Sequence, residues 1–126
     1  MLNDSKLKGN IPSSLGNLKN LKELHLENNE LGGQLPSGLG NCDKLENLNV
    51  SGNKLTGVIP SDLGKLKELR VLHIEKNTLS GDIPAALAGC IELSKMFLQG
   101  EFPSHLLIYH VHVHVLILAS FISSRR

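Results

Sequence analysis

Apolar and polar residues alternate along this chain in a pattern that recurs every 24 residues. In each unit three apolar residues stand at i, i+3 and i+5, and the last two alternate with other residues, which predicts a short strand with one buried face. The four sets are Leu21, Leu24, Leu26; Leu45, Leu48, Val50; Leu69, Leu72, Ile74; and Leu93, Met96, Leu98. A fixed period of this length predicts a solenoid, in which each unit buries its apolar face against its neighbours.

A Gly, a Pro and a further Leu also recur in each unit. We expect the glycines to lie at tight bends with positive φ, and the prolines to be the first residues of short helical stretches. The Gly four residues after the Pro, as in Pro60 to Gly64, is expected to end that stretch, and the Leu before it to point inward. These residues are Gly33, Gly57, Gly81; Pro36, Pro60, Pro84; and Leu15, Leu39, Leu63, Leu87.

An Asn follows each of the first three strand sets by three residues, whereas Glu101 follows the fourth. Where the chain turns from a strand toward the interior, backbone groups lose their strand partners, and a buried amide can satisfy them in its own and adjacent coils. An exposed turn Asn would not explain the fixed register. We therefore predict a ladder of buried amides formed by Asn29, Asn53 and Asn77, with Ser5 at the same position in the first unit.

The combined pattern Leu-x-x-Leu-x-Leu-x-x-Asn-x-Leu-x-Gly-x-Ile-Pro resembles the plant-specific class of leucine-rich repeat. The continuation from Ile59 to Gly64 resembles the ectodomains of receptor-like kinases and receptor-like proteins. The resemblance implies an α/β solenoid, a right-handed coil with short parallel concave strands and short 3-10 type convex helices. We expect this solenoid over residues 1–98, as about four units of which the first is partial, followed by a broken repeat at 99–104 and an apolar, His-containing tail at 105–126.

The same resemblance implies a non-catalytic recognition module in signalling or defence. Its partner would be a protein or peptide ligand or a co-receptor, and its location secreted or on the extracellular face of the plasma membrane. The alternatives are a stand-alone secreted inhibitor or scaffold, and a truncated part of a receptor kinase whose catalytic domain is absent. No nucleophile is paired with a base and no Gly-rich phosphate loop follows a strand, so we expect no enzyme activity and no cofactor.

The strand positions between the inward residues project outward, onto what we call the concave face. Apolar residues accumulate on this face only toward its C-terminal end. Any single position could be merely a solvated polar residue, but together they form the candidate partner-binding surface. Its expected centre comprises Val71, His73, Glu75, Lys95 and Phe97.

Composition and residue spacing argue against several other kinds of site. The 13 basic and 12 acidic residues are scattered, so nucleic acid is not expected as a partner. His25 and His73 share one repeat position two coils apart, about 10 Å, which is too far for a shared metal ion. Cys42 and Cys90 are likewise two coils apart, beyond the ~7 Å limit for a disulfide, so we expect buried free thiols.

Two short motifs and the chain ends add conditional expectations. Asn3-Asp4-Ser5 and Asn49-Val50-Ser51 match the N-glycosylation pattern, so Asn3 and Asn49 are candidate glycan sites if the chain is secreted. The first residues show no signal peptide, so we expect an internal piece of a longer protein or an incomplete gene model.

The tail is strongly apolar from residue 106 to 122 and ends in two arginines. It could associate with a membrane as a short helix, although His110, His112 and His114 are costly in lipid. The alternation of His and Val fits a strand better, in which same-face residues are ~6.6 Å apart and could not easily converge on a metal. The loss of register favours a non-native tail.

Overall fold

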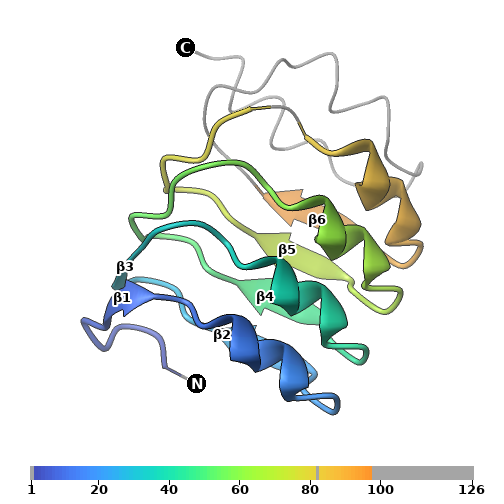
Figure 1. Cartoon of the computed structure of the whole chain (residues 1–126), viewed down its shortest axis with the longest axis horizontal. Coiled ribbons are helices and arrows are strands. Elements are labelled where there is room, and N and C mark those ends of the chain that lie inside the picture. Colours follow the sequence, from blue (N-terminus) through green and yellow to red (C-terminus); the bar gives the residue numbers. More distant parts are fainter. Residues whose placement is uncertain (1, 82, 98–126) are drawn as a thin grey trace.

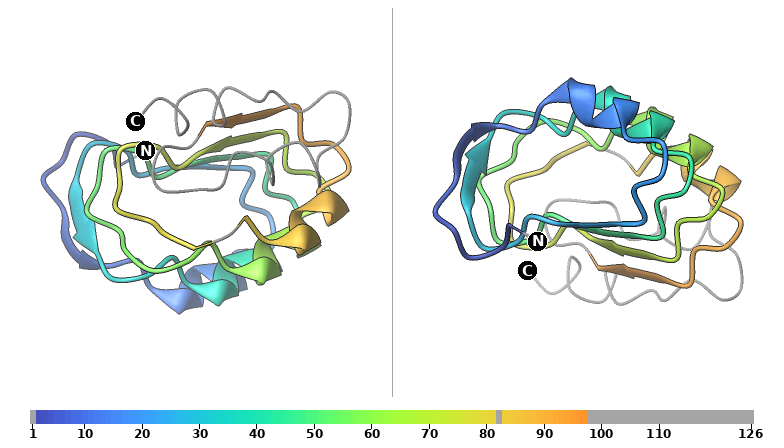
Figure 2. Two further views of the ribbon diagram at one scale, coloured as in Figure 1. Left: turned by 90° about the horizontal axis from the view of Figure 1, so that it is seen from above. Right: turned by 90° about the horizontal axis from the view of Figure 1, so that it is seen from below.

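The computed structural model describes residues 2–81 and 83–97, which form stacked coils with strands along one side and helices along the other (Figure 1). Seen from above and below, the coils superimpose as flattened rings (Figure 2). The elements are β1 (Lys8–Asn10), η1 (Ser13–Asn17), β2 (Glu23–His25), β3 (Glu30–Gly32), η2 (Ser37–Asn41), β4 (Asn47–Asn49), η3 (Ser61–Lys65), β5 (Val71–His73), η4 (Ala85–Gly89) and β6 (Lys95–Phe97), where η marks a 3-10 helix.

The main sheet confirms the predicted strands and the period. It has the order β2-β4-β5-β6, and every neighbouring pair is parallel. Residues 24 apart are paired, so that Leu24 lies beside Leu48, Leu48 beside Leu72 and Leu72 beside Met96. The period therefore places equivalent side chains in columns that run along the solenoid axis.

The core is a continuous apolar column inside the coils. The inward residues of β4 and β5, Leu48 and Leu72, are fully buried, and so are Leu45 and Leu69. At the N-terminal end of the main sheet, Leu21 and Leu24 are only half-buried, although they occupy the same repeat positions. Burial thus depends on having a coil on both sides, as expected for a solenoid.

The helices are short and of the 3-10 type, but their boundaries differ from the expected ones. Pro36, Pro60 and Pro84 precede the helices in an extended conformation, with ψ between 135° and 139°. The carbonyl of each Pro accepts the first turn bond, as from Leu39 N–H to Pro36 O at 3.2 Å. Each Pro thus contributes only its carbonyl to the first turn, and the lack of a proline N–H removes no hydrogen bond from the helix. Gly64 lies within η3 instead of ending it.

A second sheet on the flank was not predicted. Strands β1 and β3 are parallel, with Gly9 beside Leu31, and a bridge between Gln34 and Thr56 carries the same contact to the next coil. The bends that follow have the expected positive φ, at 71°, 80° and 81° for Gly33, Gly57 and Gly81. Backbone pairing therefore links the coils on two sides of the ring.

Several expectations fall outside the described residues. They concern Leu98, the broken repeat at 99–104, and the tail at 105–126 with its three histidines. Within 2–81 and 83–97 the structure contains no helix with the length and apolar character needed to cross a bilayer.

Candidate functional site

The concave face is the outward side of the β2-β4-β5-β6 sheet. Its columns follow from the strand register, because residues at equal repeat positions are neighbours across strands. The first column holds Glu23, Asn47, Val71 and Lys95, the second His25, Asn49, His73 and Phe97, and the third Glu27, Ser51 and Glu75. Each coil therefore contributes two or three side chains to one surface.

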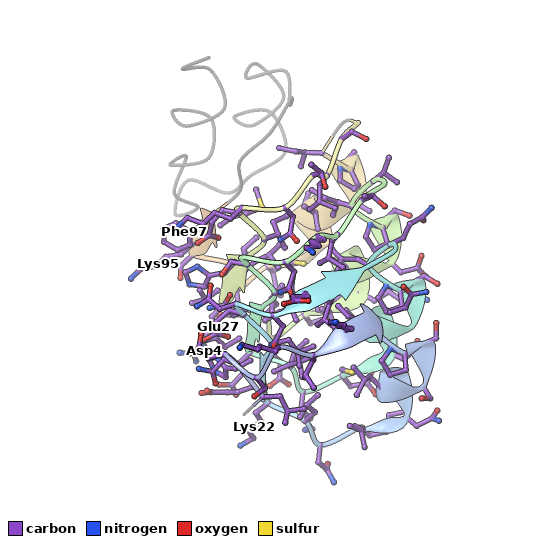
Figure 3. All side chains as sticks on the ribbon, turned by 90° about the vertical axis from the view of Figure 1, so that its left-hand side faces the viewer. Asp4, Lys22, Glu27, Lys95 and Phe97 are labelled. Carbon is purple, nitrogen blue, oxygen red and sulfur yellow. The ribbon has the colours of Figure 1, made fainter. Side chains whose placement is uncertain are left out.

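The C-terminal end of this face brings four of the predicted site residues together. Val71 pairs with Lys95 and His73 pairs with Phe97 across β5 and β6. The His73 and Phe97 rings are stacked, with centroids 4.4 Å apart and planes 6° from parallel. Figure 3 shows Lys95 and Phe97 side by side at one end of the molecule, with Glu27 nearer the N-terminal coils. The two stacked rings form a flat aromatic surface beside Lys95.

Glu75 joins the same group through His73, whose Nδ1 lies 3.5 Å from Glu75 Oε2. A matching arrangement occurs two coils away, where His25 Nε2 lies 2.9 Å from Glu23 Oε1 and His25 Nδ1 lies 3.6 Å from Glu27 Oε1. The face thus repeats a histidine–glutamate pair with one neutral coil between the two copies.

The neutral coil carries Asn47, Asn49 and Ser51. Asn49 Oδ1 accepts hydrogen bonds from the Ser51 N–H at 3.1 Å and the Ser51 Oγ at 2.7 Å. This is the candidate glycan site on the concave face. The other candidate, Asn3, is half-buried in the first coil and its amide donates to Asp4 Oδ2 at 3.1 Å.

Sequence reasoning missed a set of unpartnered acceptors. Among the residues that the structure describes, three buried side-chain polar atoms have no hydrogen-bond partner: Glu27 Oε1, Asn47 Oδ1 and Glu75 Oε1. All three belong to the concave face. A residue's repeat position predicts that it faces outward, but whether its oxygen finds a donor depends on side-chain conformations that the pattern does not contain.

The asparagine ladder lies inside the coils, next to the concave face. Asn53 Nδ2 donates to the carbonyls of Val50 and Ser51 in its own coil and of Leu26 in the preceding coil, while its Oδ1 accepts from Leu31 N–H at 3.0 Å. Asn29 and Asn77 make the same kinds of bond. In the first coil the Ser5 N–H donates to Asn29 Oδ1 at 2.9 Å. Each amide thus connects two coils.

The cysteines lie in the core and are free thiols. Cys42 Sγ donates to Leu15 O at 3.3 Å and Cys90 Sγ to Leu63 O at 3.1 Å, each in the preceding coil. Burial raises the pKa of both, that of Cys90 to about 11. No group of three or more His, Cys, Asp or Glu side chains suited to a metal ion occurs within residues 2–81 and 83–97.

Comparison with known proteins identifies the family. The leucine rich repeat models match residues 20–42 and 43–101, and together they cover all units after the first. This chain belongs to the leucine-rich-repeat family. A comparison with the curated proteins found no match.

Three of the solved structures from Arabidopsis that resemble the chain are 30–38% identical to it. The BIR2 ectodomain is 35% identical with a TM-score of 0.76 over 80% of this chain and 54% of its own. The SOBIR1 receptor kinase ectodomain is 30% identical with a TM-score of 0.75, over 89% and 64%. The receptor kinase HAESA, solved with the peptide hormone IDA and the co-receptor SERK1, is 38% identical with a TM-score of 0.73, over 84% and 19%.

These similarities confirm the resemblance to plant receptor ectodomains that the repeat pattern indicated. The chain spans less than two thirds of each of these three structures. What they share with it is the leucine-rich-repeat solenoid fold.

Proposed function

We propose that this leucine-rich-repeat chain is a non-catalytic recognition module of a plant receptor-like protein, which binds a protein or peptide partner through its concave face. The observation that carries the proposal is the convergence of Val71, His73, Lys95 and Phe97 at one end of that face, with Glu75 beside them. The HAESA structure, which contains a peptide hormone and a co-receptor, supports a partner of this class.

The chemistry of this cluster suits a peptide. The His73–Phe97 stack offers an aromatic surface of the kind that dominates interface energetics, and Val71 extends it. Lys95 and Glu75 supply opposite charges at its borders, which fix the orientation of a partner. The cluster therefore combines an apolar anchor with a polar rim.

The proposed location is outside the cell, on the plasma membrane or secreted, in signalling or defence. The similar structures from plant membrane receptors support this location. In the secretory pathway Asn3 and Asn49 are the proposed glycan sites. A glycan on Asn49 would lie on the concave face between His25 and His73 and would cover part of the binding surface.

The test uses a display library of plant-secreted peptides selected on the purified protein. Affinities of the selected peptides are then measured for the wild type, for Phe97→Ala, and for Lys65→Ala on the opposite, helical side. We expect Phe97→Ala to weaken binding at least tenfold and Lys65→Ala to leave it within twofold. Peptides that keep their affinity for Phe97→Ala and lose it with Lys65→Ala would overturn the proposal, provided both variants unfold at the wild-type temperature.

A further inference from the structure

We propose that two copies of this chain associate as an antiparallel dimer through the flank that joins the 3-10 helices to the main sheet. This flank consists of four stacked loops along one edge of the molecule, at residues 18–22, 42–46, 66–70 and 90–94 (Figure 1). It is a different face from the concave one, so the dimer goes beyond the proposed recognition function and does not depend on it.

The two middle loops of the flank carry opposite charges at each of their three outward charged positions. Residues 24 apart occupy equal positions on these loops, and they are Asp43 and Lys67, Lys44 and Glu68, and Glu46 and Arg70. Five of the six side chains are exposed and Glu46 is half-buried. None of them forms an ion pair with another described residue, although Lys67 Nζ lies 3.5 Å from Gly89 O. Their charges are therefore open to a partner.

A two-fold axis converts this alternation into complementarity. The axis lies in the plane of the flank and crosses it between the two middle loops. It reverses the order of the coils and keeps each repeat position, so that the second loop of one copy faces the third loop of the other. The three facing pairs are Asp43 with Lys67, Lys44 with Glu68, and Glu46 with Arg70, and each occurs twice. All six pairs join opposite charges, which favours association in this orientation.

The same charges disfavour the neighbouring registers. An axis through either middle loop places each of the three charged side chains of that loop opposite the same residue of the second copy. An axis through the second loop also places Lys19 opposite Lys67 and Lys22 opposite Arg70. Like charges in direct opposition work against an interface. The charge pattern therefore selects one register out of three.

The favoured register also brings two exposed apolar residues together. Ile91 in the fourth loop is 59% exposed and Leu18 in the first loop is 48% exposed, although both are large hydrophobic residues. The axis places Ile91 opposite Lys19 of the second copy, next to Leu18. A shallow hollow of about 350 Å³ lies there, lined by Asn17, Leu18, Lys19, Asn20 and Leu21. Ile91 enters this hollow and removes apolar surface from water at both ends of the dimer.

A second hollow receives a cation from the other copy. It has a volume of about 280 Å³ and is lined by Glu46, Glu68, Arg70 and Glu92, so three carboxylates face one guanidinium. In the favoured register Lys44 of the second copy lies opposite Glu68. Its ammonium group reduces the excess negative charge of the hollow.

The size of the contact sets the expected affinity. Three outward positions on four loops give about a dozen contact residues per copy, fewer than the roughly 20–30 of a standard interface. We therefore expect a reversible dimer with a micromolar dissociation constant, which salt weakens because the charges are exposed. The proposed glycan sites leave the flank clear, since Asn3 and Asn49 lie on the strand side of the coils.

The main experiment reverses the facing charges and measures the dimer by sedimentation velocity over a concentration series of the full chain. Lys44→Glu and Glu68→Lys should each raise the dissociation constant at least tenfold, because each variant places like charges opposite one another twice. An equal mixture of the two variants should restore the dimer, since each then carries the complement of the other at both contacts. Lys54→Glu, at an exposed position beside β3 on the other flank, is the matched control and should stay within twofold of the wild type.

A second pair of variants tests the apolar contact. Ile91→Asp should raise the dissociation constant at least fivefold, because it places a charge in the hollow beside Leu18. Val58→Asp is the matched control, since Val58 is 51% exposed and lies outside the flank loops. It should leave the dissociation constant within twofold.

Each outcome supports or overturns the dimer. A wild type that stays monomeric at millimolar concentration would overturn it. So would single variants that associate as the wild type does, which is the result expected if the chains met through their N-terminal ends. A mixture that stays monomeric would also overturn it, whereas restoration by mixing shows that both variants are folded. Peptide binding to the concave face should be equal in the wild type and in Lys44→Glu, so the recognition function and the dimer can fail separately.

Discussion

Asparagine occupies two kinds of position in this chain, and they illustrate what a residue's repeat position determines. At the ladder position the amide is inside the coil and its partners are backbone atoms, as for Asn53. At the strand position the amide faces outward, and Asn47 Oδ1 has no hydrogen-bond partner among the residues that the structure describes. The first role could be predicted from the register, because the backbone it serves is fixed by the period. The second depends on neighbouring side chains and could not.

The ladder makes a quantitative prediction for Asn53→Ala. The substitution leaves the carbonyls of Leu26, Val50 and Ser51 and the N–H of Leu31 without their side-chain partner in a buried site. We expect the free energy of unfolding to fall by about 2–4 kcal/mol, measured by equilibrium urea denaturation. The control is Asn20→Ala at an exposed position, with an expected change below about 0.5 kcal/mol. Equal losses in the two variants would contradict the structural role.

The thiols are predicted to be unreactive in the folded protein. Because burial raises the pKa of Cys90 from 9.0 to about 11, its thiolate fraction at pH 8 is about 100-fold below that of an exposed cysteine. Reaction with Ellman's reagent should therefore be at least about 100-fold slower in the folded than in the unfolded chain. An added exposed cysteine, Ser61→Cys, should react at the unfolded rate and serves as the control. Fast reaction of both native thiols would contradict their burial.

The sign of the pH dependence follows from the same shift. The folded-state pKa of Cys90 is raised, so the unfolded chain loses this proton first as pH increases. The contribution to stability is complete below pH 9.0 and is lost as the pH rises toward about 11. The urea midpoint should decline over this interval more in the wild type than in Cys90→Ala, whose own lower starting stability does not affect the comparison of slopes.

At the scale of the elements, the sequence predicted the strands and helices better than the contacts between them. The apolar spacing fixed one strand per coil, because each inward residue must meet its equivalent in the next coil. Strands β1 and β3 were missed because Lys8–Asn10 and Glu30–Gly32 have no alternating apolar pattern. Their pairing arises when stacking of the main sheet brings the flanks together. Gly64 was predicted to end its helix for a similar reason, because the pattern along one unit does not show the contacts between successive helices.

The close approach of successive helices predicts a large effect for Gly40→Ala. A Cβ at Gly40 would collide with the backbone carbonyl of Asp62 in the next coil, which cannot move without separating η2 from η3. We expect a loss of about 2–4 kcal/mol in the free energy of unfolding, with the urea midpoint as the measurement. Gly32→Ala in β3 is the matched control, since its Cβ would have only an ordinary contact with Lys54 O at 3.9 Å. A neutral or slightly stabilising result is expected there, and the same loss at both glycines would contradict the steric argument.

At the scale of the whole molecule, stability is a sum of neighbour contacts, and the first coil has a neighbour on one side only. Its inner residues border an apolar hollow of about 260 Å³ on the N-terminal side. The hollow is lined mainly by apolar side chains. Residues at the same repeat positions in later coils are buried. The lining residues are Leu2, Leu7, Ile11, Leu15, Leu24, Leu26 and Leu31. We therefore expect the isolated chain to be marginally stable and prone to associate through this end.

This end gives the last prediction. Fusing one further 24-residue unit before Leu2, copied from residues 26–49 so that Leu2 keeps its repeat register, would cover the hollow and place a strand beside β2, where His25 O already accepts from Leu2 N–H. We expect a higher urea midpoint and a larger m-value, because more surface is buried on folding, and a lower tendency to associate in sedimentation velocity. A fused unit with its inward leucines changed to serine has the same length but cannot fill the hollow, and it should leave both properties unchanged. Equal gains from the two fusions would mean that added chain, and not the covering of the apolar end, stabilises the solenoid.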